Sequence, residues 1–383
     1  MTPSELDAAF QRVRGWRSNG TPILSLSLDR VSDIHLPRSI SARVKDLLRQ
    51  IEPNQADHAW TMGWRGNLER VQELMPRLRN DLGHGVALFL NRDREEYVSL
   101  PRRLREAAAS APLASLRPLH EVIANSYSMA VVALDPRVAH LYSYALNTIH
   151  QAETLDGEEI RKRNRAGWYG LDEYTNRNRA QEVTHHHFRS AAELLSKLVE
   201  TRRLQLIAIG GHHQAVDEFR NLLDPALAKL VAGTFIVDLH TLTPAAVRDH
   251  CISIEDAWRN ARQAELAQSL AATPPDRIAV GPKPVIDAAN RAAVSLLVLD
   301  SKAVSPGVVC TACSWIGWTG SSCPVCGGAV RSSPDLYDDA IRLVLDSGGT
   351  VEHTSSVGFL QEREVVALLR FPLSQPVQRS LAS

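Results

Sequence analysis

Four of the five cysteines form two Cys-X-X-Cys pairs, which is the pattern of a metal site. Cys310 and Cys313 make the first pair, and Cys323 and Cys326 make the second after nine intervening residues. Each such turn directs two thiolates to one point, so two turns complete a tetrahedral zinc site. Zinc with four thiolate ligands has no open position for water or substrate. The spacing therefore predicts a structural zinc ribbon at residues 308–330 rather than a catalytic metal.

The basic segment 161–188 indicates a different chemistry, because arginines and aromatic residues are interleaved in it. Arginine forks suit phosphate groups, and aromatic faces suit unstacked bases. The residues that we expect to contact RNA are Arg161, Lys162, Arg163, Arg165, Trp168, Tyr169, Arg177 and Arg179. The alternative interpretation is a solvated surface loop with a few aromatic anchors.

Two histidine groups and a lone cysteine are weaker candidates. The three histidines of 185–187 diverge by about 100° each on a helix, so they cannot all face one ion. The Gly-Gly-His-His segment 210–213 ends a predicted strand, where glycines commonly serve only the turn; His212 or His213 would carry any chemistry there. Cys251 stands alone and is predicted to be a small buried apolar residue.

Composition describes a folded chain of 383 residues with 44% apolar residues, enough for two or three domains. Lys+Arg and Asp+Glu both total 43, so any attraction to nucleic acid must be local. Residues 1–16 lack the apolar core of a signal peptide, and no apolar run approaches the length of about 18 residues that would span a membrane. Because paired free thiols also suit a reducing compartment, we predict a cytoplasmic protein without membrane contact.

Periodicity predicts an α/β fold in three domains. The first domain, 1–112, would contain helices 4–15, 38–51 and 67–82 and strands 22–29 and 85–90, followed by a linker at 107–118.

The middle domain, 118–272, carries the basic loop 161–188. Its predicted strands are 129–134, 138–145, 204–209 and 234–239. Its predicted helices start at 188, 215, 225 and 244, the last interrupted around 251–253. This alternation predicts three layers.

The last domain, 276–383, would be a βαβ unit with the zinc ribbon inserted after strand 293–299. Helices are predicted at 283–291 and 336–345, and a final strand at 365–371.

The order of these elements resembles the bacterial relatives of the archaeo-eukaryotic class-1 release factors, and also Pelota-like rescue factors and Balon-like hibernation factors. The resemblance is carried by segments 23–29, 85–90, 131–144, 206–211, 293–299 and 367–371 and by the four cysteines. It implies a three-domain release-factor or Pelota-like architecture, shaped like a tRNA, that enters the ribosomal A site. The middle-domain loop would then reach toward the peptidyl-transferase centre and the first domain toward the decoding centre.

The loop departs from the release-factor pattern. A release factor carries Gly-Gly-Gln there, which positions a water on the peptidyl-tRNA ester. Residues 165–170 of this chain read Arg-Ala-Gly-Trp-Tyr-Gly, and the nearest glutamine is Gln181, inside an expected helix. Gly167 and Gln181 are therefore only weak catalytic candidates. We also recognise no stop-codon motif in the first domain.

These features favour a ribosome-binding factor that occupies the A site in hibernation or rescue. Its implied partners are 23S and 16S rRNA, the P-site tRNA and a translational GTPase such as elongation factor Tu. One alternative is a peptidyl-tRNA hydrolase that uses the altered loop. The other is a zinc-ribbon adaptor that binds proteins and has no role on the ribosome.

Overall fold

The computed structural model describes residues 1–30, 39–52, 58–156, 171–354 and 363–373, with only the backbone for 171–178 and 180. The described contacts form two compact units. Residues 3–125 and 261–383 make one, called the terminal unit, and residues 126–260 make the other, called the middle unit. The α/β fold class is confirmed, while the division into three domains stays a prediction. Among the described helices, none is long and apolar enough to cross a membrane.

The N-terminal lobe of the terminal unit is built on an antiparallel sheet of order β3-β2-β1-β4. Its strands are β1 (Ile23–Asp29), β2 (Gly85–Asn91), β3 (Arg94–Leu100) and β4 (Ala107–Ala111). The helices are α1 (Pro3–Arg14), α2 (Ile40–Gln50), α3 (His58–Asn80) and α4 (Arg117–Ala124). Apolar residues of α2 and α3 form one core with β1 and β2, which explains the helical stripe of Val71, Leu74 and Leu78.

Two predictions for this lobe were wrong. The expected linker 107–118 contains β4, whose alanines pair with β1, and the start of α4. A run of small residues has no periodicity to reveal a strand, so pairing with β1 decides the structure. Helix α3 begins at His58 rather than at residue 67. Strand β1 is also buried on both faces: the Ser27 hydroxyl donates to the Arg105 carbonyl at 2.6 Å, and Ser25 Oγ accepts from the Ser115 amide at 2.9 Å.

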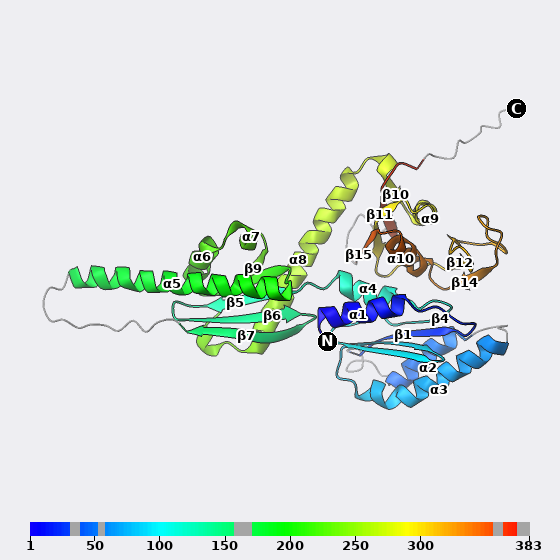
Figure 1. Cartoon of the computed structure of the whole chain (residues 1–383), viewed down its shortest axis with the longest axis horizontal. Coiled ribbons are helices and arrows are strands. Elements are labelled where there is room, and N and C mark those ends of the chain that lie inside the picture. The colour runs from blue at the N-terminus through cyan, green and yellow to red at the C-terminus, as the bar shows by residue number, and fades with distance from the viewer. Residues whose placement is uncertain (31–38, 53–57, 157–170, 355–362, 374–383) are drawn as a thin grey trace. The chain divides into compact units, whose positions relative to one another are not determined.

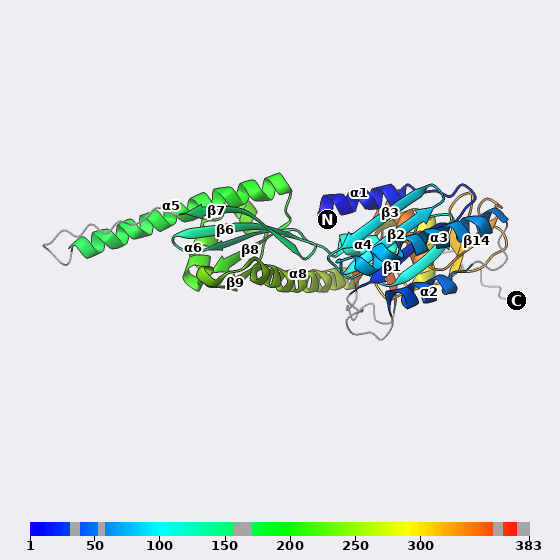
Figure 2. The ribbon, with the colours of Figure 1, turned by 90° about the horizontal axis from the view of Figure 1, so that it is seen from below.

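The middle unit has the three layers that were predicted. Its sheet has the order β7-β6-β5-β8-β9. The strands are β5 (Met129–Leu134), β6 (Val138–Ala145), β7 (Thr148–Asp156), β8 (Leu206–Gly211) and β9 (Val231–Ile236). One face packs against α5 (Leu171–Arg202), α6 (His213–Leu222) and α7 (Pro225–Ala228), and the other against the first half of α8 (Pro244–Ala272). Figures 1 and 2 show α5 and α8 on opposite sides of this sheet.

Three predictions for the middle unit need correction. Helix α5 begins at Leu171, so the second half of the expected loop 161–188 is helical. No strand was predicted directly after residue 145, yet strand β7 forms there because it pairs with β6. Helix α8 continues without interruption through 251–253, where Cys251 is fully buried in the core as predicted.

The C-terminal lobe of the terminal unit has a sheet of order β10-β16-β11-β15. Its strands are β10 (Ile278–Val280), β11 (Val294–Asp300), β15 (Thr350–Thr354) and β16 (Val365–Leu369), with helices α9 (Pro282–Asn290) and α10 (Leu336–Asp346). Parallel strands β11 and β15 are joined through α10 in a βαβ unit, but the sequence did not predict β15, and the predicted final strand, β16, pairs antiparallel with β11. Between β11 and α10 lies a three-stranded insertion, β12 (Gly307–Cys310), β13 (Ile316–Gly317) and β14 (Val330–Ser333). Short 3-10 helices occupy Leu239–Thr241 and Pro275–Arg277.

Buried charges join the two lobes within the terminal unit. Arg117 donates to Asp335 Oδ2 at 2.6 Å, and Arg342 donates to the carbonyl oxygens of Arg14 at 2.7 Å and Ala114 at 2.9 Å. Both arginines are nearly inaccessible to solvent. Removing one partner of such a network leaves a buried charge unpaired, so these contacts hold the lobes in one arrangement.

Candidate metal centre and nucleic-acid interface

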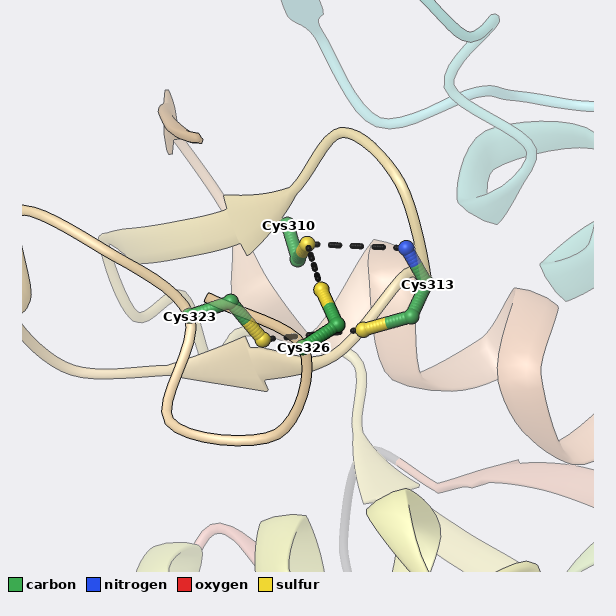
Figure 3. Close-up of side chains that lie close together, drawn as sticks. All are labelled: Cys310, Cys313, Cys323 and Cys326. Atoms are coloured by element: carbon green, nitrogen blue, oxygen red, sulfur yellow. Dashed lines mark hydrogen bonds between the residues drawn. The ribbon is translucent and has the colours of Figure 1, made fainter. Parts of the chain in front are cut away.

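The four cysteines of the insertion converge on one point. Figure 3 shows their sulfur atoms facing one another, and all four lie within 4.8 Å of each other. The Sγ–Sγ distance is 3.5 Å for Cys310 and Cys326 and 3.6 Å for Cys313 and Cys323. Tetrahedral zinc with Zn–S bonds of about 2.3 Å requires S–S separations of about 3.8 Å. The cluster can therefore bind a metal ion. The fold supports the prediction that the two Cys-X-X-Cys pairs converge on one site.

The two Cys-X-X-Cys turns have the same backbone construction. The Ser314 amide donates to the Cys310 carbonyl at 3.2 Å, and the Gly327 amide donates to the Cys323 carbonyl at 2.9 Å. Both amides belong to residues with positive φ, 61° for Ser314 and 70° for Gly327. This left-handed conformation closes each turn, and glycine adopts it without the steric penalty that serine carries.

Backbone amides also face the sulfurs. The amides of Ala312 and Cys313 approach Cys310 Sγ at 3.4 and 3.5 Å, and the Val325 amide approaches Cys323 Sγ at 3.4 Å. Donation from Cys313 N–H lowers the pKa of the Cys310 thiol to about 6. Amides aimed at sulfur favour the thiolate, which is the form that ligates metal.

The ribbon is fastened to the neighbouring core. The Asn290 side chain at the end of α9 donates to the Ile316 carbonyl at 2.7 Å and accepts from the Ile316 amide at 2.9 Å. Ile316 and Val309 of the ribbon are buried in the C-terminal core cluster. A metal bound by the four cysteines would crosslink the two Cys-X-X-Cys turns of a ribbon that is itself packed on this core. Such a crosslink fits a structural role.

The predicted RNA-contact residues are mostly beyond the described part of the chain. Arg161, Lys162, Arg163, Arg165, Trp168 and Tyr169, together with the catalytic candidate Gly167, lie outside the described residues. The backbone of Arg177 is part of α5. The side chains of Arg179 and Gln181 are exposed on the same helix. RNA contact by these residues stays a prediction.

Helix α5 extends well past the sheet that supports it. The first residue of α5 in the core is Phe188, followed by Ala191, Leu195 and Val199. The residues from Leu171 to His187 span about 25 Å at the helical rise of about 1.5 Å per residue. Figures 1 and 2 show this N-terminal part of α5 projecting beyond the end of the sheet. The helix thus places the backbone of its N-terminal turns beyond the middle-unit core.

The three consecutive histidines diverge as expected for a helix. His185 and His186 are exposed, whereas His187 is buried. Burial lowers the pKa of His187, so this imidazole is favoured in its neutral form. No described group of metal-ligating side chains other than the four cysteines lies close enough together to hold an ion.

The glycines of segment 210–213 serve close packing. A Cβ at Gly210 would lie 2.3 Å from the Phe235 ring, and a Cβ at Gly211 would lie 2.3 Å from the Leu134 carbonyl oxygen. Gly211 also has φ of +148°, a conformation that side chains rarely adopt. His212 follows as the N-cap of α6 and is exposed.

The fold brings two of the candidates together. Gln181 on α5 and His212 at the start of α6 line one groove, along with Gln214 and Asn221 of α6. The latter two residues were missed because nothing in the sequence indicates that α6 lies beside α5. Another missed feature is Glu255, which is buried on α8 and accepts from the Tyr144 hydroxyl at 2.7 Å.

Residues 115–256 match the model of a family described as bacterial archaeo-eukaryotic release factor family 10. The middle unit of this chain is therefore similar to a bacterial release-factor family. The match contains the whole sheet of the middle unit and helix α5, and it confirms the family resemblance predicted from the sequence.

Several solved structures are similar to this chain at low sequence identity. An archaeal translation termination factor, aRF1, is 17% identical over 97% of this chain and 99% of its own, with a TM-score of 0.26. Pelota of Archaeoglobus fulgidus is 13% identical over 97% of this chain and 93% of its own, with a TM-score of 0.36. Dom34 of S. cerevisiae is 12% identical over 79% and 78%, with a TM-score of 0.40. A comparison with curated proteins gave no match.

Proposed function

We propose that this translation factor of the release-factor type binds the ribosome and blocks its A site, in hibernation or rescue. The observation that carries the proposal is a release-factor-type middle unit combined with a loop, 165–170, that reads Arg-Ala-Gly-Trp-Tyr-Gly. A middle unit of this type would keep the fold and the basic loop that contact the ribosome. Without Gly-Gly-Gln it lacks the group that positions water in a release factor. This combination favours occlusion without hydrolysis.

The projection of α5 supports this proposal. Its N-terminal turns extend about 25 Å beyond the first core residue, Phe188. The basic segment 161–165 precedes this end of the helix by five residues in the sequence. A basic tip on a rigid helix can enter a narrow rRNA-lined site, where neutralising phosphates supplies affinity and stacking of Trp168 orients the tip. The peptidyl-transferase centre in 23S rRNA and the adjacent P-site tRNA are the proposed contacts.

The terminal unit would provide the remaining contacts. We propose that the N-terminal lobe faces 16S rRNA at the decoding centre and that a translational GTPase such as elongation factor Tu delivers the protein. Zinc is the proposed ion of the four-cysteine cluster, since thiolates in a closed tetrahedral set favour it. Its role would be to stabilise the ribbon, and the chain would act in the cytoplasm.

The test of ribosome binding is cosedimentation of the full chain with 70S ribosomes over a salt series. The test variant reverses three charges, with Arg161, Arg163 and Arg165 changed to Glu. Each lost phosphate contact lowers the salt slope by about 0.7, so the slope should fall by about 2 and binding should weaken. A control variant reverses three exposed charges elsewhere in the middle unit, at Arg137, Lys197 and Arg220. Equal loss in both variants, or no loss in the test variant, contradicts the proposed contact.

A peptidyl-tRNA release assay on the bound fraction separates occlusion from hydrolysis. Binding without peptide release is the expected result. Release that is lost in Gln181→Ala and Gly167→Pro would instead identify a hydrolase with an altered loop. Absence of ribosome binding at low and moderate salt would overturn the proposal and favour a zinc-ribbon adaptor.

A further inference from the structure

A groove in the middle unit runs between α5 and α6. Gln181, Thr184 and His185 of α5 line one wall, and Gln214 and Asn221 of α6 line the other. Its volume is about 690 Å³, within the range of about 300–1,000 Å³ that is typical of small-molecule sites. The proposed occlusion of the A site by the basic tip makes no use of this groove.

The walls carry groups that both donate and accept hydrogen bonds. Exposed carboxamides come from both helices, Gln181 on α5 and Gln214 and Asn221 on α6. Glu218 is the one acidic side chain among the lining residues, and its carboxylate already accepts from Gln214 Nε2 at 2.9 Å. Among the lining side chains that the structure describes, there is no lysine or arginine. The groove is therefore polar and carries little charge, which does not suit a polyanionic backbone.

The floor of the groove is apolar and held by the core. Phe188 and Ala215 are buried there, and the Phe188 ring packs edge-on against Phe219 with ring centroids 6.0 Å apart. Because Phe188 and Ala215 belong to the same core cluster, the two walls are fixed relative to each other. The site needs no folding step before a ligand enters it.

We propose that this groove binds one unpaired nucleobase of RNA. A base is flat and largely uncharged, with an apolar body and a rim of donors and acceptors. Carboxamides are suited to reading such a rim through paired donor and acceptor groups. A saturated lipid chain would offer no hydrogen-bonding groups to these carboxamides, and a duplex would present phosphates to a groove whose described lining has no lysine or arginine. The source of the base as ribosomal RNA rests on the proposed function, whereas the chemistry of the groove does not.

The test uses uncharged ribonucleosides as probes, so that the basic tip contributes nothing. Saturation-transfer NMR on the full chain should detect binding of at least one of the four nucleosides. Loss of two hydrogen bonds in Gln214→Ala/Asn221→Ala should weaken that binding about five- to tenfold. Thr184→Trp, which fills the groove from its wall, should abolish it. Asn260→Ala, which removes an exposed carboxamide on α8, should leave it unchanged.

Several outcomes would overturn the inference. One is that no nucleoside binds, and another is that both groove variants bind as tightly as the natural chain. Inorganic phosphate that competes fully with the nucleoside would point to an anion site, and an uncharged tripeptide that binds where nucleosides do not would point to a peptide site. If the natural chain sediments with ribosomes but binds no nucleoside, only this inference fails. If nucleosides bind in the groove but ribosomes do not, the proposed function fails and the base site stands.

Discussion

The replacement of Asp338 by Asn tests how the two lobes of the terminal unit are joined. Asp338 lies in the first turn of α10, and its Oδ1 accepts from the amides of Leu116 at 2.9 Å and Arg117 at 2.8 Å. These amides belong to the start of α4, which has no side-chain cap of its own. The C-terminal lobe thus caps a helix of the N-terminal lobe.

Burial raises the pKa of Asp338 from its ordinary value of 3.8 to about 6, and the negative charges of Asp339 and Asp335 add to the rise. A rise of about 2 pH units corresponds to about 3 kcal/mol. Because solvent still reaches part of the side chain, we take about 1–3 kcal/mol as the cost of ionisation in the folded state. The pKa of Asp338 is higher in the folded state than in the unfolded state. The stability that protonated Asp338 contributes is therefore fully present below about pH 4 and is lost as pH rises through about 6.

Asp338→Asn keeps the accepting oxygen and removes the charge. Near pH 7.5 the amides of Leu116 and Arg117 should therefore be protected from hydrogen exchange by about 1–3 kcal/mol more in the variant than in the natural chain. Near pH 4.5 the difference should largely vanish. Asp338→Ala, which removes the acceptor, should reduce protection at both pH values.

The matched control is Asp287→Asn, which removes an exposed acid on α9. It should leave the exchange of both amides unchanged at either pH. Equal exchange rates of the Leu116 and Arg117 amides in Asp338→Asn and in the natural chain near pH 7.5 would contradict this prediction. An equal gain in protection at both pH values would contradict it as well.

Three further predictions concern single side chains. Tyr144→Phe removes the hydrogen bond to buried Glu255 and should lower the free energy of unfolding of the middle unit by about 1.5–3 kcal/mol, measured by urea denaturation; an unchanged midpoint would contradict this. Gly211→Ala places a Cβ 2.3 Å from the Leu134 carbonyl oxygen and should cost about 2–3 kcal/mol in the same assay. Cys323→Ser should lower the bound metal measured by mass spectrometry and expose the ribbon to protease, and full metal content in the variant would exclude the proposed site.

Local patterns in the sequence were sufficient for several features. The Cys-X-X-Cys spacing predicted the four-sulfur cluster, because the chelating geometry is set within a few residues of each pair. The apolar run 129–134 predicted a strand, which is β5, and all of its residues are buried. The alternation of periods predicted β11, α10 and β16 of the C-terminal lobe, whereas β15, the parallel partner of β11, was not predicted.

The sequence by itself determined the α/β class, the family resemblance and the cysteine site, because these depend on periodicity and spacing along the chain. The tertiary structure alone decided that the alanines of 107–111 pair with β1, that Ser25 and Ser27 are buried, and that Gln181 meets His212 across a groove. The reason is physical: strand pairing and the burial of polar groups depend on partners distant in sequence, and no local pattern identifies those partners.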